Sequence, residues 1–205
     1  MVAEFTKKEI RDAVWQYEGS KSHGPDVFNF NFIKNSLEVL KVEIVAVMAN
    51  FHVIGYIPKG CNASFIGLVP KVRDPVMLEQ YRPISLVEAM YKIIFKVLAG
   101  RIKQVLSSII DESQSVFIKD RGILDSVLMA NEVAEDLRRG GRSGLCLKVD
   151  FEKAYDSVSW AFLYDMLHRM GFHSKCISWI RGCMESATVS ILVNGSPTEE
   201  FKPSR

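Results

Sequence analysis

Apolar residues return every three or four positions over most of this chain, and they alternate with polar residues over a few short stretches. From Phe30 to about Phe51 this spacing predicts an amphipathic helix that packs against a core. Further helices are predicted over residues 7–17, 85–107, 124–138, 159–170 and 174–184. Residues 64–71 and 188–193 are typical of strands, and a proline ends the first of them.

Capping residues set the expected starts of two helices. Thr6 and Glu9 have the spacing of a capping box, in which each side chain accepts a hydrogen bond from the other residue's backbone N–H. Ser85 and Glu88 repeat that spacing, so we expect them to open the helix that ends near Ser107.

The last third of the chain has its own boundary signals. Ser159 and Ser174 are expected to cap two helices whose inward faces carry Phe162, Leu163, Met166 and Leu167 in the first and Ile177, Ile180 and Met184 in the second. Asn194–Gly195 is the strongest short hairpin signal in the sequence and should pair residues 188–193 with residues 199–201. The sum of these elements predicts an α+β fold.

The segment from residue 145 to residue 156 carries the most informative chemistry. Its apolar positions, Leu145, Leu147 and Val149, alternate with Cys146, Lys148 and Asp150, which predicts a strand. Asp150 would then stand at the end of that strand, where a hard cation such as Mg²⁺ can neutralise it, and Mg²⁺ typically takes one or two carboxylates plus substrate phosphates. This favours phosphoryl or nucleotidyl transfer. The alternative is that Asp150 only ends the strand and Asp156 only caps the next turn.

Composition narrows the classes of protein. With 205 residues, of which 48% are apolar, the chain has the size of an ordinary single domain and is not a disordered tail. The formal net charge is only +2, but residues 59–103 hold eight basic and three acidic side chains, a local +5. Such a segment is expected in a protein that binds a phosphate-bearing partner, although a solvated helix face would show the same charges.

Cysteine spacing and the N-terminal residues indicate in which cellular compartment the protein is expected. Cys61, Cys146, Cys176 and Cys183 form no Cys-x-x-Cys pair, which argues against a disulfide framework and a zinc site. Residues 1–20 are charged at seven positions and resemble no signal peptide, and no stretch is apolar for the length of a membrane helix. We therefore expect an intracellular protein, nuclear or cytoplasmic, with no membrane partner.

Several long motifs in one order resemble a known family. The segment Val-Asp150-Phe-Glu-Lys-Ala-Tyr155-Asp156-Ser-Val158 resembles the first catalytic motif of reverse transcriptases of LINE-type (non-LTR) retrotransposons. Tyr81-Arg-Pro-Ile-Ser-Leu86 and Tyr91-Lys-Ile-Ile-Phe-Lys-Val-Leu-Ala99 are similar to the fingers of that family. The similarity continues through residues 111–121 and 192–201.

The resemblance implies a right-hand polymerase-like fold. Residues 1–140 would form a helix-rich, basic, fingers-like region. Residues 141–205 would form part of the palm, with a partial antiparallel sheet and the first catalytic carboxylate. The partners it implies are an RNA template, a DNA primer and deoxynucleoside triphosphates, and the cofactor it implies is Mg²⁺.

Residue roles follow from the family motif, position by position. Asp150 matches the first metal-ligand aspartate, the catalytic one, and the backbone carbonyl of Phe151 would be a second ligand. Tyr155 matches the aromatic residue that lies under the sugar and excludes a 2′-hydroxyl. The cations that meet the triphosphate of the incoming nucleotide would be Lys71 and Arg82. Template contacts would come from Gln114 and Arg121.

The sequence departs from the family pattern at two places. The family usually has glycine where Asp120 precedes Arg121, which puts a carboxylate beside the expected template path. The catalytic hairpin of the family has two adjacent aspartates, and this sequence contains no Asp-Asp pair and no aspartate after Asp165. We therefore expect a truncated reverse transcriptase fragment that is inactive alone, unless a second chain supplies the missing part of the palm.

Two other functions stay open at this stage. One is a non-catalytic RNA- or DNA-binding remnant that uses the basic segment and Arg82. The other is a Mg²⁺-dependent phosphotransferase in which Asp150 and Asp156 form the whole acidic pair.

Overall fold

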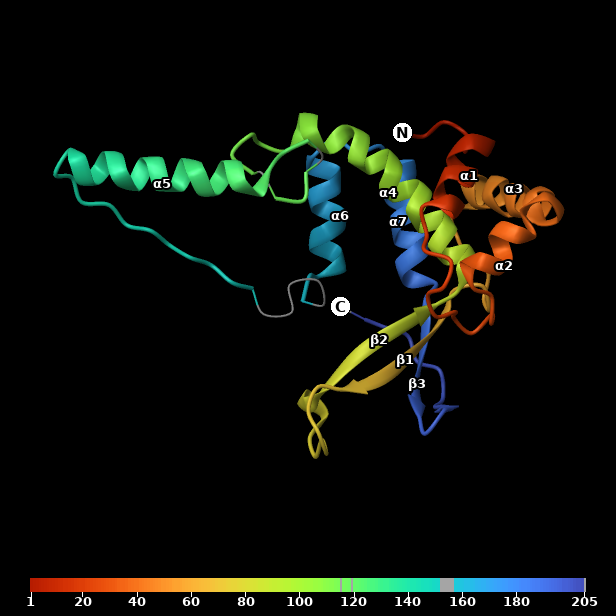
Figure 1. Cartoon of the computed structure of the whole chain (residues 1–205). Coiled ribbons are helices and arrows are strands. Elements are labelled where there is room, and N and C mark those ends of the chain that lie inside the picture. The colour runs from red at the N-terminus through yellow and green to blue at the C-terminus, as the bar shows by residue number, and fades with distance from the viewer. Residues whose placement is uncertain (115, 119, 152–156, 205) are drawn as a thin grey trace. The chain divides into compact units, whose positions relative to one another are not determined.

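The computed structural model describes residues 1–114, 116–118, 120–151 and 157–204 (Figure 1). These residues belong to two compact units, Met1–Leu98 with Trp160–Arg205, and Ala99–Ser159. Helices and a mixed four-stranded sheet together confirm the α+β class. The division into fingers at residues 1–140 and palm at residues 141–205 stays a prediction. None of the described helices combines the length and the apolar character that a membrane span requires.

The first unit begins with three helices, α1 (Lys7–Trp15), α2 (Phe30–Asn35) and α3 (Leu37–Ile54). The capping box that opens α1 is confirmed, because the Glu9 N–H donates to Thr6 Oγ1 at 3.1 Å and the Thr6 N–H donates to Glu9 Oε2 at 2.8 Å. The single helix predicted from Phe30 to Phe51 is two helices. Ser36 leaves the helical conformation with φ −96° and ψ 7°, while the apolar spacing continues through the break.

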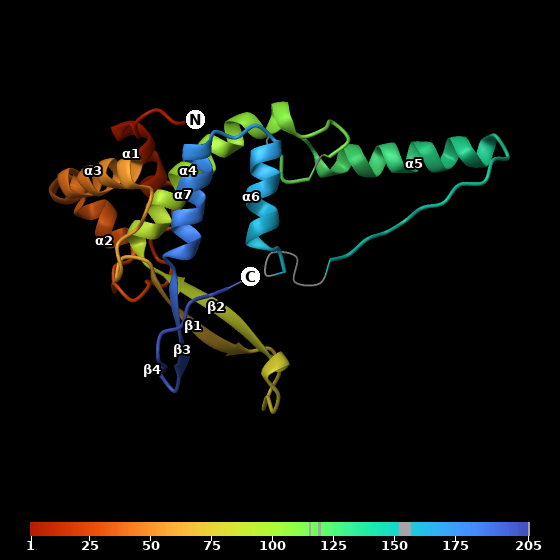
Figure 2. The ribbon, with the colours of Figure 1, turned by 180° about the vertical axis from the view of Figure 1, so that it is seen from behind.

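The sheet belongs to the same unit and has the order β2-β1-β3-β4 (Figure 2). Its strands are β1 (Ala63–Pro70), β2 (Tyr81–Val87), β3 (Thr188–Val193) and β4 (Ser196–Pro197). β1 pairs antiparallel with β2 but parallel with β3, so the sheet is mixed and not wholly antiparallel. The predicted Asn194–Gly195 hairpin is confirmed, with φ 51° and 82° at the two turn residues and a bridge between Val189 and Phe201.

The start predicted for the fourth helix is wrong. Ser85 lies in β2, paired with Ile66, and α4 (Ala89–Ile109) begins only after Glu88. Seven residue pairs join β2 to β1, and this ladder outweighs a local capping signal. The first turn of α4 is capped from a distant loop, where Asp26 Oδ2 accepts a hydrogen bond from the Ala89 N–H at 2.6 Å.

The final helices of the first unit are α6 (Trp160–Arg169) and α7 (Ser174–Glu185). Their positions agree with the sequence, but their most buried residues differ from those expected. In α6 the expected Leu163, Met166 and Leu167 are half-buried, whereas Phe162 is exposed and Tyr164 is buried. In α7 the buried side chains are Cys176, Trp179 and Cys183, and the expected Ile177, Ile180 and Met184 are half-buried. His173, and not Ser174, caps α7, because its Nδ1 accepts from the Lys175 N–H at 3.1 Å. Both faces of α7 are apolar enough to be buried, so periodicity alone could not choose between them.

The core of this unit forms where α7 meets α3. Trp179 is 1% exposed, its ring lies 6.4 Å from that of Phe51, and its Nε1–H donates to the His52 carbonyl at 3.2 Å. Asn62, just before β1, donates to the Cys183 carbonyl and to Ser186 Oγ, both at 2.8 Å. Segments more than 120 residues apart in sequence are therefore joined by packing and by satisfied buried hydrogen bonds.

The second unit holds the end of α4 and the helix α5 (Ile123–Arg139). The prediction of a strand from Leu145 to Val149 is wrong. Residues 142–151 have no regular secondary structure. Leu145 is 97% exposed and Val149 is 57% exposed. A strand needs a neighbouring ladder to satisfy its N–H and C=O groups, and no strand occurs among the described residues of this unit.

Gly182 provides a test of the α3–α7 contact. A Cβ built on Gly182 would lie 1.7 Å from the Gly55 carbonyl oxygen, and both groups are backbone. We expect Gly182→Ala to lower the free energy of unfolding by about 3 kcal/mol through overpacking. Gly100→Ala is the matched control, because its Cβ would meet nothing within 4 Å in a helix, and it should raise stability by up to about 1 kcal/mol. Urea unfolding measures both, and equal effects of the two substitutions would contradict the contact.

Glu88 provides a test by pH. Glu88 is 7% exposed, and burial raises the pKa of its carboxyl to about 7, with Asp26 and Glu200 adding to the rise and the Ala63 N–H opposing it. Because the pKa is raised above its ordinary value of 4.5, the folded state holds this proton more tightly. The resulting stability is present below pH 4.5 and is lost as pH rises through 7.

We therefore expect the free energy of unfolding of the unmodified chain to fall by on the order of 2 kcal/mol between pH 5 and pH 8 because of Glu88. Glu88→Gln should abolish this fall, because its amide does not ionise. Urea unfolding of both proteins at the two pH values measures that difference. Parallel pH dependence of the two proteins would show that Glu88 ionises normally in the fold.

Candidate functional site

The β1–β2 hairpin brings together the two cations predicted to meet a nucleotide. Arg82 lies opposite Val69 in the ladder, and Lys71 follows Val69 by two residues. The Lys71 N–H continues the pairing by donating to the Gln80 carbonyl at 2.7 Å. Since side chains two apart in a strand share a face, and diagonal neighbours across a ladder are within reach of long side chains, Lys71 and Arg82 lie together on one face.

The loop beyond the hairpin is held by its own hydrogen bonds. Gln80 Oε1 accepts from the Val76 N–H at 2.6 Å and from the Met77 N–H at 3.1 Å. Lys71 Nζ donates to the Glu79 carbonyl at 2.8 Å, which directs its ammonium along the loop. In both ribbon views the hairpin extends away from the helices of its unit (Figures 1 and 2). Lys71 and Arg82 are both exposed.

The residues around the predicted metal ligand are only partly described. Asp150 and Phe151 are exposed and lie in a segment without regular structure. Tyr155 and Asp156 lie outside the described residues. In the part of the chain that the structure describes, no group of three or more His, Cys, Asp or Glu side chains could hold a metal ion. Asp150 can supply one carboxylate, and one carboxylate does not make a complete two-ion site.

Arg121, a predicted template contact, is occupied by backbone acceptors. Its Nη1 donates to the Asp111 and Gln114 carbonyls at 2.6 and 2.7 Å. Its Nη2 donates to the Ser107 and Ile110 carbonyls at 3.1 and 3.0 Å. This guanidinium closes the C-terminal end of α4, where helix carbonyls lack partners and the dipole favours a cation. Gln114 contributes its carbonyl to the same cluster, and its side chain is exposed.

Three of the four cations of α4 are partly or fully buried, and only Lys103 is exposed. Lys92 is half-buried, and burial lowers the pKa of its ammonium. Lys96 Nζ lies 5.0 Å from the centre of the Tyr17 ring, a cation–π contact within the unit, and Arg101 is 7% exposed. The basic segment at residues 59–103 is therefore not one continuous solvent-exposed surface. Most of its exposed cations, Lys71, Arg73 and Arg82, lie on the β1–β2 hairpin and its loop.

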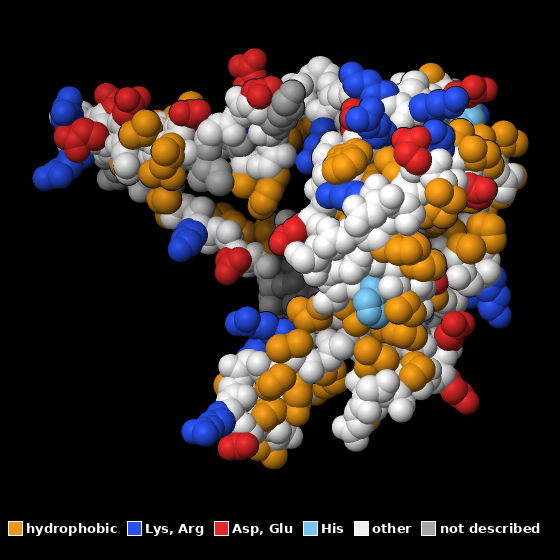
Figure 3. All heavy atoms as spheres, turned by 45° about the vertical axis from the view of Figure 1, so that its right-hand side comes forward, with side chains coloured by type: hydrophobic (Ala, Val, Ile, Leu, Met, Phe, Trp, Pro, Cys, Tyr) orange, Lys and Arg blue, Asp and Glu red, His pale blue; other side chains and the backbone are white. Residues whose placement is uncertain are grey.

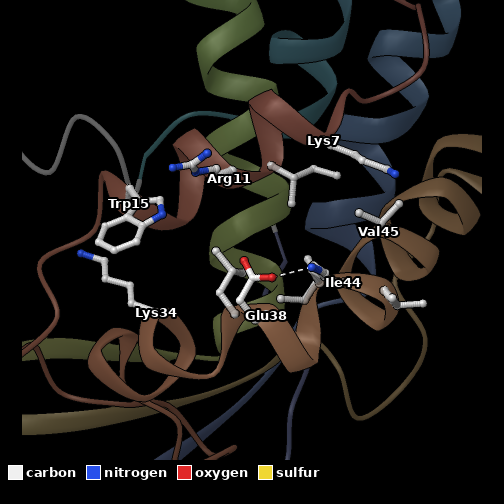
Figure 4. A pocket seen from close by; sticks show the side chains of 11 residues that line it. Lys7, Arg11, Trp15, Lys34, Glu38, Ile44 and Val45 are labelled. Carbon is white, nitrogen blue, oxygen red and sulfur yellow. Dashed lines mark hydrogen bonds and ion pairs between the residues drawn. The ribbon is translucent and has the colours of Figure 1, made fainter.

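Sequence reasoning gave no role to the cations near the N-terminus. Four of them line a pocket together with Trp15, on the helices α1, α2 and α3 (Figure 4). The available signal was the four-residue spacing of Lys7, Arg11 and Trp15, which places them along one side of α1.

Arg121 yields a test of its capping role. Arg121→Ala should leave four carbonyls near the end of α4 without their donor. We expect the free energy of local opening at residues 105–110 to fall by on the order of 1 kcal/mol, so that the amides there exchange faster. Arg139→Ala is the control, because Arg139 makes a single exposed ion pair with Glu135 at 3.1 Å in the same unit. If both variants leave the exchange of residues 105–110 unchanged, Arg121 does not cap the helix.

Comparison with known proteins shows which family the chain resembles. Residues 69–205 match the family described as reverse transcriptase (RNA-dependent DNA polymerase). The chain is 28% identical over 194 residues to an uncharacterized 149 kDa protein of transposon TX1 from Xenopus laevis, covering 95% of this chain and 15% of that protein. It is 25% identical over 186 residues to a Pol polyprotein of the type-2 retrotransposable element R2DM from Drosophila melanogaster, covering 91% of this chain and 17% of that protein.

A third relative is the RNA-directed DNA polymerase from the mobile element jockey of Drosophila funebris, 24% identical over 157 residues, or 75% of this chain and 17% of that protein. The chain thus spans less than a fifth of the length of these three relatives. The family match covers the last two residues of β1, all of β2, Asp150 and the β3–β4 hairpin. This chain belongs to the reverse transcriptase family, and its relatives are proteins of non-LTR retrotransposons.

Proposed function

We infer that this chain is the part of a retrotransposon RNA-directed DNA polymerase that receives the incoming deoxynucleoside triphosphate. The observation that carries this proposal is the common face of Lys71 and Arg82 on the β1–β2 hairpin, inside the region that matches the family. Arg82 offers a planar fork of donors that fits two phosphate oxygens, while Lys71 offers a point charge. Proline at position 83 restricts the backbone of Arg82 and so limits where its fork can point.

The other family positions have roles in the same proposal. Asp150 would hold Mg²⁺, with the Phe151 carbonyl beside it, and Mg²⁺ bound there would neutralise charge on the triphosphate. Tyr155 would lie under the sugar of the nucleotide. The RNA template and DNA primer would pass the region of Gln114, while Arg121 shapes that region through its hold on the end of α4.

Binding of a deoxynucleoside triphosphate to the purified 205-residue chain tests this function. We expect dTTP with Mg²⁺ to bind in calorimetric titration, and Arg82→Ala or Lys71→Ala to weaken it ~10-fold, as the loss of a charge-assisted phosphate contact predicts. Lys59→Ala is the matched control, an exposed cation of the same unit outside the hairpin strands.

The metal ligand is tested in the same titration. Asp150→Asn should reduce the gain in affinity that Mg²⁺ provides and leave the metal-free affinity unchanged, because only the carboxylate charge is removed. If Lys59→Ala weakens dTTP as much as Arg82→Ala does, the contact is nonspecific charge attraction and the hairpin is not the nucleotide site.

A further inference from the structure

The helices α1, α2 and α3 enclose a groove of about 560 Å³ that lies outside the region matching the family (Figure 4). Its base and walls are aliphatic, formed by Ile10, Leu37, Val42, Ile44 and Val45. Ile10 and Ile44 are buried and belong to the core, but Val42 is 66% exposed. Val39, one turn away on α3, is also exposed, so the apolar surface continues along that helix.

The rim of the groove is strongly cationic. Lys7, Arg11, Lys34 and Lys41 line it, against the single carboxylate of Glu38. Glu38 pairs with Lys41 at 2.5 Å. Among the described residues, Lys7 and Arg11 form no hydrogen bond or ion pair, although Arg11 adds to the larger effect of Lys41 in lowering the pKa of the Glu38 carboxyl. The space-filling view shows basic side chains beside hydrophobic ones over these N-terminal helices (Figure 3).

Trp15 stands at one end of the groove and is already engaged. The Lys34 ammonium lies 5.3 Å from the centre of its ring and also donates to the Tyr17 carbonyl at 2.6 Å (Figure 4). A single-stranded nucleic acid needs aromatic faces on which successive bases stack. This groove offers one aromatic ring, with a cation over it, and a floor of aliphatic side chains that suits apolar anchors instead.

We propose that this groove binds an acidic amphipathic helix of a partner protein. Apolar side chains at positions i, i+3 or i+4 and i+7 of that helix would fill the aliphatic floor, as in other helix-in-groove complexes. Carboxylates on its flanks would meet Lys7 and Arg11, which is the charge complementarity that selects an acidic partner over a neutral or basic one. The exposed Val42 and the adjoining Val39 would be covered in the complex.

A synthetic peptide tests the proposal directly. The probe is a fluorescent 16-residue helical peptide with leucine at positions 4, 8, 11 and 15 and glutamate at the flanking positions, titrated into the full chain. We expect micromolar binding that weakens as salt rises, since rim charges act through screened attraction. The same peptide with lysine in place of every glutamate should bind at least ~10-fold more weakly.

Matched variants locate the binding site. Val42→Asp and Val53→Asp make the same change at exposed valines of α3, but only Val42 lines the groove. We expect Val42→Asp and Arg11→Glu each to weaken the peptide ~10-fold or more, while Val53→Asp and Lys59→Glu leave its affinity within about twofold. Circular dichroism of each variant confirms that the helices still form.

Three outcomes would overturn the proposal. The first is equal affinity for the glutamate and lysine peptides, which would remove the charge selection. The second is equal loss with Val42→Asp and Val53→Asp, which would place binding elsewhere on α3. The third is an oligonucleotide that binds the full chain in an Arg11-dependent manner when the acidic peptide does not, because the groove would then be a nucleic-acid surface.

Discussion

The close approach of α3 and α7 is the constraint on which the first unit depends. At Gly182 the backbone of α7 comes so near the Gly55 carbonyl that no Cβ fits between them. The approach buries Trp179 against Phe51 and lets its indole N–H reach the His52 carbonyl. Asn62 then fixes the end of α7 to the start of β1 through two buried hydrogen bonds. The sheet, and the hairpin that extends from it, takes its position from this contact.

The functional surfaces follow from that scaffold. β1 is placed by Asn62 and by its parallel pairing with β3, and β2 is placed by the antiparallel ladder. Lys71 and Arg82 lie on one face at the far end of this ladder, because its register puts Arg82 opposite Val69, two residues before Lys71. Nearer the start of α3, the helices α1 and α2 leave an aliphatic groove with a cationic rim. One packed core thus supports a candidate nucleotide contact in the family region and a candidate protein contact outside it.

Features that depend on neighbours within a few residues could be predicted from the sequence. Thr6 and Glu9 cap α1 as expected, and Asn194–Gly195 turns the β3–β4 hairpin. Where local and distant interactions compete, the distant ones decide. Ser85 carries a capping signal, yet it lies in a strand because β1 offers it a ladder partner about 20 residues away. The buried face of α7 likewise depends on the position of α3, which its own periodicity does not contain.

The candidate site shows the same limit. The sequence pattern predicted a helix start at Ser85, so the ladder that puts Lys71 and Arg82 on one face was not predicted. The hydrogen bonds of Arg121 could not be predicted either, because its acceptors are backbone carbonyls, which every residue possesses. The alternation from Leu145 to Val149 has the pattern of a strand, but a pattern forms a strand only where a second strand completes its hydrogen bonds.

Native-state hydrogen exchange of the chain tests the central contact most directly, because it measures the opening free energy of each segment. Because their contact holds the core of the first unit, we expect the amides of α3 and α7 to share the highest opening free energy and to lose protection together as denaturant is added. Amides of residues 142–151 should exchange at nearly the rate of an unfolded chain. If α3 opens at a distinctly lower free energy than α7, with no effect on α7, the two helices do not depend on their contact.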